Sequence, residues 1–201
     1  MNVAIVDYGA GNVPSVERAL RKLGANPIRV SDANGISKAG AIVLPGVGHY
    51  SALIRALDEK ELRAPLVKAI FRGKPFLGIC LGLQALYQSS EEAPDLAGLG
   101  IFSGRVCALP ANVKLPHMGW NRLKIQRGSA LLEGLTEDHY FYFAHSFAAQ
   151  KADGETLAVC DYGAEFTAAL EVDRVCAVQF HPEKSGEAGA VLLSNFLRLA
   201  A

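Results

Sequence analysis

The stretch Pro75-Phe76-Leu77-Gly78-Ile79-Cys80-Leu81-Gly82-Leu83-Gln84 decides the fold. Its apolar first half, Pro75 to Ile79, predicts a buried strand, and Leu81 to Tyr87 predicts a helix directly behind it. Between them, Gly78-x-Cys80-x-Gly82 has the form of a nucleophile elbow, a sharp turn that lifts a reactive atom above a sheet. A helix N-terminus beneath Cys80 would favour the thiolate form of its side chain. Taken alone, a buried structural cysteine is an equally good interpretation.

Short apolar runs alternate with amphipathic stretches on either side of this segment. They predict strands at 2–7 and 41–44, a helix at 13–23, and two helical pieces within 50–71 that separate near 58–60. The second half predicts strands at 101–109, 122–125, 139–147, 156–161, 168–171 and 174–180, then a helix at 188–199. The expected fold class is α/β, a doubly wound, mainly parallel sheet with helices on both faces and an added antiparallel portion in the second half. Without a linker or repeat, residues 1–201 are expected to form one domain.

The composition narrows the class of protein. Lysine plus arginine equal aspartate plus glutamate at 20 each in 201 residues, which argues against a nucleic-acid partner. No run approaches the ~20 consecutive apolar residues of a membrane span, and the first residues read as a strand instead of a signal peptide. The cysteines are scattered without a Cys-x-x-Cys pair, which predicts reduced thiols and a cytoplasmic location. Three of them are interpreted as small buried hydrophobes: Cys107, Cys160 and Cys176.

A partner for Cys80 lies near the end of the sequence, in His181-Pro182-Glu183. Proline disfavours helical backbone in the residue before it, so His181 is expected to be extended. In an extended chain, residues two apart face the same side with Cα atoms roughly 6–7 Å apart. Glu183 can then bond one imidazole nitrogen while the other faces Cys80. The three side chains predict a triad of nucleophile, base and orienting carboxylate.

Ligands in open α/β sheets bind beyond the carboxyl ends of the strands. Four segments of interest are expected there, at 7–12, 45–49, 78–82 and 181–185. Acyl transfer also needs donors for a developing oxyanion. The N–H of Leu81, directly after the nucleophile, is one candidate, and the flexible segment that contains Val47 and Gly48 can supply another.

Two other kinds of site are disfavoured. A phosphate-cradling loop would need Gly-x-Gly-x-x-Gly or a Walker sequence, and Gly9-x-Gly11 is followed by Pro14 where the third glycine belongs. The five histidines show neither His-Glu-x-x-His nor cysteine-paired spacing. Neither a metal site nor a cofactor is expected.

Several sequence blocks match a known family. Gly78-Ile79-Cys80-Leu81-Gly82-Leu83-Gln84 and Gln179-Phe180-His181-Pro182-Glu183-Lys184-Ser185 resemble the class I, triad-type glutamine amidotransferases. Four further blocks are similar to the glutaminase subunits of imidazole glycerol phosphate synthases, so that the resemblance covers nearly the whole chain: Asp7 to Asn12, Leu44 to His49, Pro116 to Asn121, and Tyr142 to Ser146.

This resemblance implies a flavodoxin-like amidotransferase fold and a heterodimeric enzyme of histidine biosynthesis. This subunit would release ammonia from L-glutamine. A (β/α)₈-barrel cyclase partner would use that ammonia to make imidazole glycerol phosphate and an aminoimidazole carboxamide ribotide.

The resemblance also implies roles for individual residues. Cys80 would attack the amide, His181 would shuttle the proton and Glu183 would orient His181. The glutamine pocket would be formed by Gly48, Gln84, His145, Ser146 and Phe147. Where the family often has tyrosine, this chain has Phe147, which matters little if only the main chain touches glutamine. The surface that faces the cyclase would comprise Tyr8, Asn12, Pro116, Met118, Trp120, Asn121 and Tyr142.

Three other functions remain open at this point. A glutaminase that serves a different synthase would keep the triad but lose the blocks at 7–12 and 116–121, which are present here. A cysteine hydrolase with a substrate of its own would use a similar turn and need no partner. A nucleotide-binding module on a doubly wound sheet would lack the triad.

Overall fold

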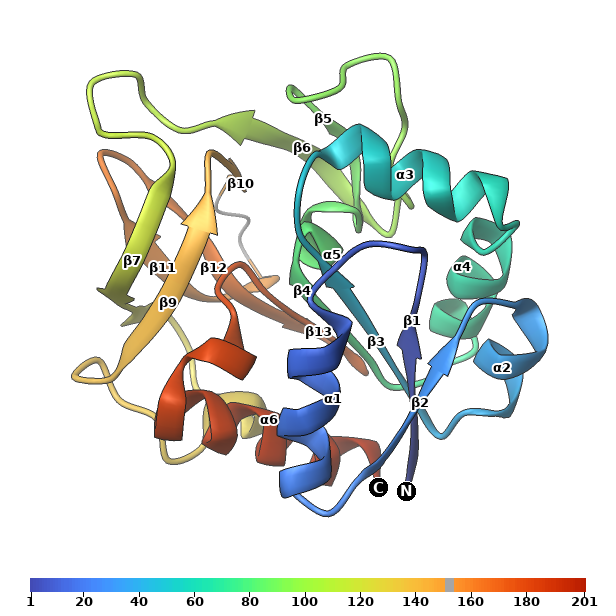
Figure 1. The fold of residues 1–201 in the computed structure, drawn as a ribbon. Helices are drawn as coiled ribbons and strands as arrows, with labels where there is room; N and C mark the ends of the chain where they lie inside the picture. The colour runs from blue at the N-terminus through green and yellow to red at the C-terminus, as the bar shows by residue number, and fades with distance from the viewer. Residues whose placement is uncertain (151–153) are drawn as a thin grey trace.

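An eight-stranded sheet runs through the computed structural model, which describes residues 1–150 and 154–201 (Figure 1). Five neighbouring strands are parallel, and three more extend the sheet in antiparallel fashion. This arrangement confirms the predicted fold class, since the antiparallel strands come from the second half of the chain. In spatial order the strands are β2 (Asn26–Val30), β1 (Asn2–Val6), β3 (Ala41–Gly46), β4 (Phe76–Cys80), β13 (Val175–Val178), β12 (Glu165–Val172), β11 (Thr156–Asp161) and β8 (Lys124–Ile125).

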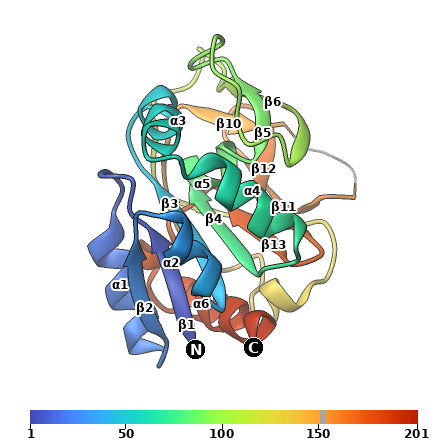
Figure 2. The same cartoon turned by 90° about the vertical axis from the view of Figure 1, so that its right-hand side faces the viewer.

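Helices cover both faces of this sheet, because parallel strands are apolar on both sides and need cover on each. Helices α1 (Val13–Lys22) and α6 (Gly186–Ala200) pack on one face. On the other lie α2 (Ala33–Lys38), α3 (Tyr50–Glu59) and α4 (Arg63–Phe71), and Figure 2 looks onto the face that α2 and α4 cover. The predicted helix at 13–23 and the two predicted helical pieces within 50–71 are confirmed.

The prediction failed in three places near the parallel strands. The helix expected from Leu81 to Tyr87 is only the four-residue α5 (Leu81–Gln84), because the chain enters strand β5 (Tyr87–Ser90) and pairs with β6 (Phe102–Ala108). Strand β2 was not predicted, since it is an edge strand with three exposed positions and contains Pro27. The short helix α2 was not predicted either.

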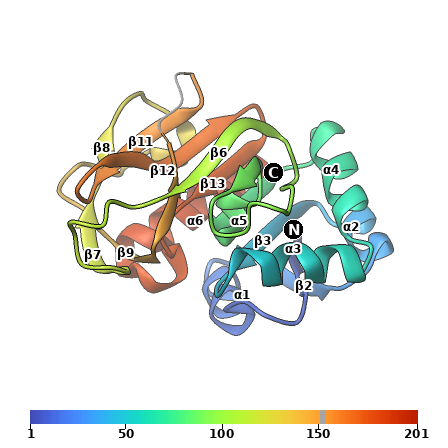
Figure 3. The ribbon, with the colours of Figure 1, turned by 90° about the horizontal axis from the view of Figure 1, so that it is seen from above.

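Two smaller sheets complete the molecule and lie beside and above the carboxyl ends of the parallel strands (Figures 1 and 3). One contains β10 (Phe147–Ala149), β6 and β5, and the other is an antiparallel ribbon of β7 (His117–Arg122) and β9 (Tyr140–His145). The single strand expected at 139–147 is therefore two strands in different sheets, divided at Ser146. Strand β7 had no prediction, and only the end of the strand expected at 122–125 forms β8.

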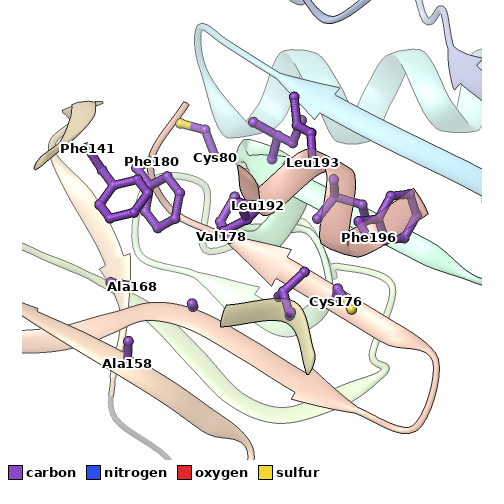
Figure 4. Close-up of a cluster of buried hydrophobic side chains, with 14 of the residues drawn as sticks. Cys80, Phe141, Ala158, Ala168, Cys176, Val178, Phe180, Leu192, Leu193 and Phe196 are labelled. Atoms are coloured by element: carbon purple, nitrogen blue, oxygen red, sulfur yellow. The ribbon is translucent and has the colours of Figure 1, made fainter. Parts of the chain in front are cut away.

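Two separate clusters of buried side chains fill the two faces of the large sheet. The cluster under α1 and α6 includes Phe141 of the ribbon and Phe180, whose rings lie 4.4 Å apart (Figure 4). Phe180 directly precedes His181, so this contact fixes the ribbon against the loop that carries the predicted base. Cys160 and Cys176 are buried in the same cluster as expected, and burial raises the pKa of each thiol to about 12. Cys107 is only half-buried.

Candidate active site

Cys80 ends strand β4 with φ 55° and ψ −107°, a backbone conformation that residues other than glycine rarely adopt. Such a conformation costs of order 1–3 kcal/mol and persists only where the surroundings enforce it. The surroundings here are tight, because a Cβ at Gly82 would overlap the carbonyl oxygen of Leu44. The chain therefore makes the sharp strand-to-helix turn that the glycine spacing predicted.

The helix behind Cys80 is too short for the electrostatic role expected of it. Helix α5 has four residues, and a helix dipole grows from the alignment of many peptide units. Cys80 is 3% exposed. A thiolate at this position therefore needs other groups to stabilise it.

His181 and Glu183 form a buried pair behind this turn. His181 Nδ1 lies 2.9 Å from Glu183 Oε1, and the two side chains are 2% and 1% exposed. His181 is extended as expected, but Pro182–Lys184 forms a 3₁₀ turn instead of continuing the extension, because proline readily occupies the first position of a helical turn. Burial disfavours a charge on His181, yet its interactions with the Cys80 and Glu183 side chains raise its pKa to about 10. The pair therefore favours an imidazolium beside the Cys80 sulfur.

Glu183 also receives a hydrogen bond from a residue that was expected only at a partner surface. The side-chain amide of Asn12 donates to Glu183 Oε1 over 3.1 Å. The other carboxylate oxygen, Oε2, has no hydrogen-bond partner among the described residues. Asn12 and His181 thus both hold the same oxygen of the Glu183 carboxylate.

A cavity of about 260 Å³ opens onto Cys80 and His181. The segment after β3 forms one wall, because Gly46 pairs with Cys80 across the sheet and Gly48 turns away with φ 96°. The cavity is lined by every residue predicted for the oxyanion site and the glutamine pocket, and by Cys80 and His181 of the predicted triad. Three lining residues had no predicted role: Glu92, Ala144 and Lys184. The full lining is Val47, Gly48, Cys80, Leu81, Gln84, Glu92, Ala144, His145, Ser146, Phe147, His181 and Lys184.

Gln84 has a defined orientation at this cavity. Its Nε2 atom lies 2.7 Å from the carbonyl oxygen of Phe147 and 3.0 Å from Oε1 of Gln179. Because a carbonyl can only accept, the amide nitrogen of Gln84 must face Phe147. The remaining oxygen, Gln84 Oε1, is buried without a partner among the described residues.

His145 and His117 form a buried chain that leads to the same carbonyl. His145 Nδ1 lies 2.9 Å from the oxygen of Phe147 and must donate to it, so Nε2 accepts from His117 Nδ1 over 3.1 Å. Burial lowers the pKa of His117 to about 4 and that of His145 to about 3, which keeps both rings neutral. Asn121 completes the chain, with its amide nitrogen 3.4 Å from His117 Nε2. The sequence alone assigned no role to His117.

Glu92 is the acidic residue of the cavity and was missed. Its Oε2 accepts from the backbone N–H of Tyr50 over 2.8 Å, and its Oε1 lies 3.9 Å from His49 Nε2. Glu92 sits in an irregular polar segment after β5, so no periodicity or motif marked it. Only the fold brings its carboxylate to the cavity.

The residues predicted to face a partner divide into three groups. Met118 and Trp120 are 64% and 55% exposed on the ribbon, next to the exposed Pro116 and Tyr140. The side chains of Asn12, Asn121 and Tyr142 are partly exposed. The prediction that Tyr8 lies on the partner surface was wrong, because Tyr8 is 3% exposed and packs in the core under α3 and α4. Burial raises the pKa of its hydroxyl to about 12, so Tyr8 is a packing residue in this conformation.

The described chain shows neither a metal centre nor a membrane-spanning helix. Across residues 1–150 and 154–201, no three histidine, cysteine or acidic side chains are grouped to hold a metal ion. Within the same ranges, no helix has the length and apolar character needed to cross a membrane.

Comparison with known proteins agrees with this geometry. The chain matches the family Glutamine amidotransferase class-I over residues 4–200. A crystal structure of a glutamine amidotransferase has a TM-score of 0.79 at 22% identity and covers 98% of both chains. The structure of PurLQS from Thermotoga maritima has a TM-score of 0.77 at 20% identity and covers 98% of this chain and 97% of its own. Fold and site together define a class-I glutamine amidotransferase, an enzyme.

More similar relatives narrow the family. The chain is 50% identical over 197 residues to imidazole glycerol phosphate synthase subunit HisH of Methanothermobacter thermautotrophicus, with 98% of both chains covered. It is 45% identical to the subunits of the same name from Aquifex aeolicus and Pyrococcus furiosus, of which 98% is covered in each case. The chain belongs to this HisH family.

Proposed function

We propose that this chain is the glutaminase subunit of an imidazole glycerol phosphate synthase. It hydrolyses L-glutamine and passes the ammonia to a (β/α)₈-barrel cyclase subunit in a heterodimer. The cyclase then makes imidazole glycerol phosphate and aminoimidazole carboxamide ribotide in histidine biosynthesis. The observation that carries the proposal is the cavity lined by Cys80, His181 and Gln84, with His181 held by the buried Glu183 carboxylate. The names of the relatives support the choice of synthase.

The reaction begins at the sulfur of Cys80. The thiolate attacks the side-chain amide carbon of glutamine, a C–S bond forms, and the carbonyl electrons move to oxygen. The N–H groups of Leu81 and of the Val47–Gly48 segment are the proposed donors to that oxyanion. His181 then gives its proton to the amide nitrogen, the C–N bond breaks, and ammonia leaves.

A water molecule completes the cycle. His181 takes a proton from the water as it adds to the thioester, and the C–S bond breaks to release glutamate and regenerate the thiolate. Glu183 holds the imidazole throughout, and Asn12 holds Glu183. The balance is glutamine plus water to glutamate plus ammonia, with no cofactor required.

The polar groups of the cavity suit the two charged ends of an amino acid. Glu92 is the carboxylate available to the α-ammonium group, and the side chain of Gln84 lines the same cavity. The main chain at His145, Ser146 and Phe147 forms the opposite wall. Lys184 brings a positive charge, with its Nζ atom 5.5 Å from the centre of the Tyr142 ring.

The proposed cyclase-binding surface is the outer face of the β7–β9 ribbon. Its exposed apolar side chains lie next to the cavity, and exposed aromatic residues often anchor interfaces. The proposed contacts on or beside this face are Pro116, Met118, Trp120 and Tyr142, with Asn12 at the start of α1 and Asn121 near the end of β7. We also infer one amidotransferase domain over residues 1–201, since β13 pairs with β4. The proposed location is the cytoplasm, where the four unpaired cysteines would stay reduced.

The variant Cys80→Ala tests this proposal in the assembled complex with the cyclase subunit. Synthesis from glutamine should fall at least about 10³-fold because the nucleophile is lost. Synthesis from added ammonium should continue at the wild-type rate, because the cyclase consumes ammonia. Loss of both activities in a properly assembled complex would contradict the division of labour, and retained glutamine-dependent synthesis would contradict the role of Cys80.

A further inference from the structure

We propose that Gln179 is a further catalytic residue, whose side-chain amide donates a hydrogen bond to the sulfur of Cys80 and holds it as the nucleophilic thiolate. This inference rests on the proposed role of Cys80. Gln179 follows strand β13, the neighbour of β4 in the large sheet, and is 0% exposed. Its Nε2 atom lies 3.6 Å from the Cys80 sulfur, which is within hydrogen-bonding range for sulfur.

The direction of this hydrogen bond follows from its neighbours. The Phe147 carbonyl fixes the amide nitrogen of Gln84, and that nitrogen also faces Gln179 Oε1 over 3.0 Å. Since Oε1 of Gln179 is thereby held as an acceptor, its nitrogen must face Cys80. A flipped amide at either glutamine would place two acceptors, or two donors, against each other.

The sulfur needs such a donor. Cys80 is 3% exposed, and a buried charge is costly unless it is paired and hydrogen-bonded. The four-residue helix α5 supplies little dipole. His181 supplies a positive charge, and Gln179, two residues earlier in the same segment after β13, supplies an N–H.

A purely packing role does not account for Gln179. Its backbone N–H continues the sheet by donating to the Ala168 oxygen, so the side chain is not needed for that. The strand before it is fully buried and consists of Val175, Cys176, Ala177 and Val178. A buried amide among such residues costs free energy unless its polar atoms are satisfied. The side-chain partners of Gln179 are Gln84 and Cys80, both of which line the cavity.

Gln84 links this contact to the cavity. Its amide nitrogen holds Gln179 Oε1, and its side chain is part of the cavity lining. Hydrogen bonds in such a chain strengthen one another, so the Gln84–Gln179 contact supports the N–H···S contact at the attacking atom.

The test measures the acidity of the Cys80 thiol in the assembled complex. The rate of alkylation by iodoacetamide is followed against pH, with mass spectrometry reporting modification at Cys80 alone. Gln179→Met keeps the size of the side chain and removes the donor. The apparent pKa of the Cys80 thiol should rise by about one unit, and kcat for glutamine hydrolysis should fall about 10- to 100-fold, as expected for loss of a hydrogen bond to a charged group. KM should change less than about threefold, because Gln179 does not line the cavity.

Two further variants separate catalysis from packing. Gln179→Glu keeps the shape of the side chain and puts acceptors beside the sulfur, so the pKa of the Cys80 thiol should rise at least as far. It also serves as the test if Gln179→Met does not fold. The matched control is Thr167→Val, a fully buried residue whose hydroxyl forms hydrogen bonds with Thr156 and the Gln150 carbonyl. It should lower stability without moving the pKa of the Cys80 thiol.

An alkylation profile that is unchanged in the folded Gln179 variants would overturn this inference. That result is distinguishable from failure of the proposed function. Alkylation reports the contact between Gln179 and Cys80 whether or not Cys80 is the nucleophile, whereas glutaminase activity in Cys80→Ala reports the nucleophile alone.

Discussion

The turn at Cys80 and the β7–β9 ribbon border the same cavity but are built in opposite ways. The turn lies inside the large sheet, and its neighbours are backbone atoms of β3 and β13. The ribbon is a separate two-stranded sheet, with buried His117 and Phe143 on one face and exposed Trp120 and Met118 on the other. The turn at Cys80 has no room for a larger side chain, whereas the ribbon has an exposed outer face.

This difference separates two tasks of the molecule. The turn holds the reacting sulfur in a strained position, which requires that nothing near it moves. On the buried face of the ribbon, His117 and His145 form a hydrogen-bonded chain that ends on the Phe147 carbonyl at the cavity. The outer face of the same ribbon is left free for contact with another protein.

The largest expected effect comes from adding one methyl group to the turn. In Gly82→Ala the new Cβ meets the Leu44 carbonyl oxygen, which is backbone and cannot rotate away. We expect a loss of about 3 kcal/mol or more in the free energy of unfolding, measured by urea denaturation. The control Gly128→Ala has open space around its Cβ and should change stability by less than about 0.5 kcal/mol. Equal effects in the two variants would show that the turn is not rigid.

A substitution on the outer face of the ribbon should change partner affinity and leave stability nearly unchanged. Trp120→Ala removes a ring that is 55% exposed, so the free chain should keep its stability within about 0.5 kcal/mol. Affinity for the cyclase subunit, measured by calorimetry, should fall by about 2–3 kcal/mol if the ring is an anchor. Phe71→Ala is the matched control, since Phe71 is 74% exposed at the end of α4, a helix that Figure 1 shows on the opposite side of the molecule from the ribbon, and should leave affinity unchanged. Unchanged affinity in Trp120→Ala would place the interface elsewhere.

The buried histidines of the ribbon predict a pH dependence of stability. Their folded pKa values, about 4 for His117 and about 3 for His145, lie below the usual unfolded value of about 6.5. The unfolded chain therefore takes up protons first as pH falls, so stability present above pH 6.5 is lost between there and pH 4. We expect a fall of at least about 2 kcal/mol over that range in urea titrations, since each unit of pKa shift corresponds to about 1.4 kcal/mol, and a smaller fall in His117→Phe. A wild-type curve that is flat from pH 7 to pH 4 would contradict the neutral pair.

The smallest expected effect is that of removing the Asn12 side chain, which bonds the Glu183 carboxylate behind the turn. Asn12→Ala removes one hydrogen bond to Glu183, so kcat for glutamine hydrolysis should fall by about three- to tenfold, equivalent to roughly 1 kcal/mol. Affinity for the cyclase should be less affected than kcat if Asn12 acts through Glu183. A loss of affinity with unchanged kcat in the saturated complex would return Asn12 to the interface alone.

The sequence predicted the turn well and the ribbon poorly, for a physical reason. Buried parallel strands such as β3 and β4 are continuous apolar runs, and the glycines around Cys80 mark a turn that tolerates few alternatives. Ribbon strand β7 contains Gly119 and has a single buried residue, His117. Its pairing with β9 therefore depends on tertiary contacts. The same limit applies to Glu92, which reaches the cavity only because β5 pairs with β6. Tyr8 was misplaced because a motif match does not report burial.

One main-chain atom also bears on how this site can vary among relatives. The carbonyl oxygen of Phe147 receives hydrogen bonds from both Gln84 and His145. Every amino acid has that oxygen, so position 147 can exchange phenylalanine for tyrosine while the wall of the cavity keeps its polarity. Natural selection can therefore tune the ring at this position freely, whereas the two side chains that bind the carbonyl have no such latitude.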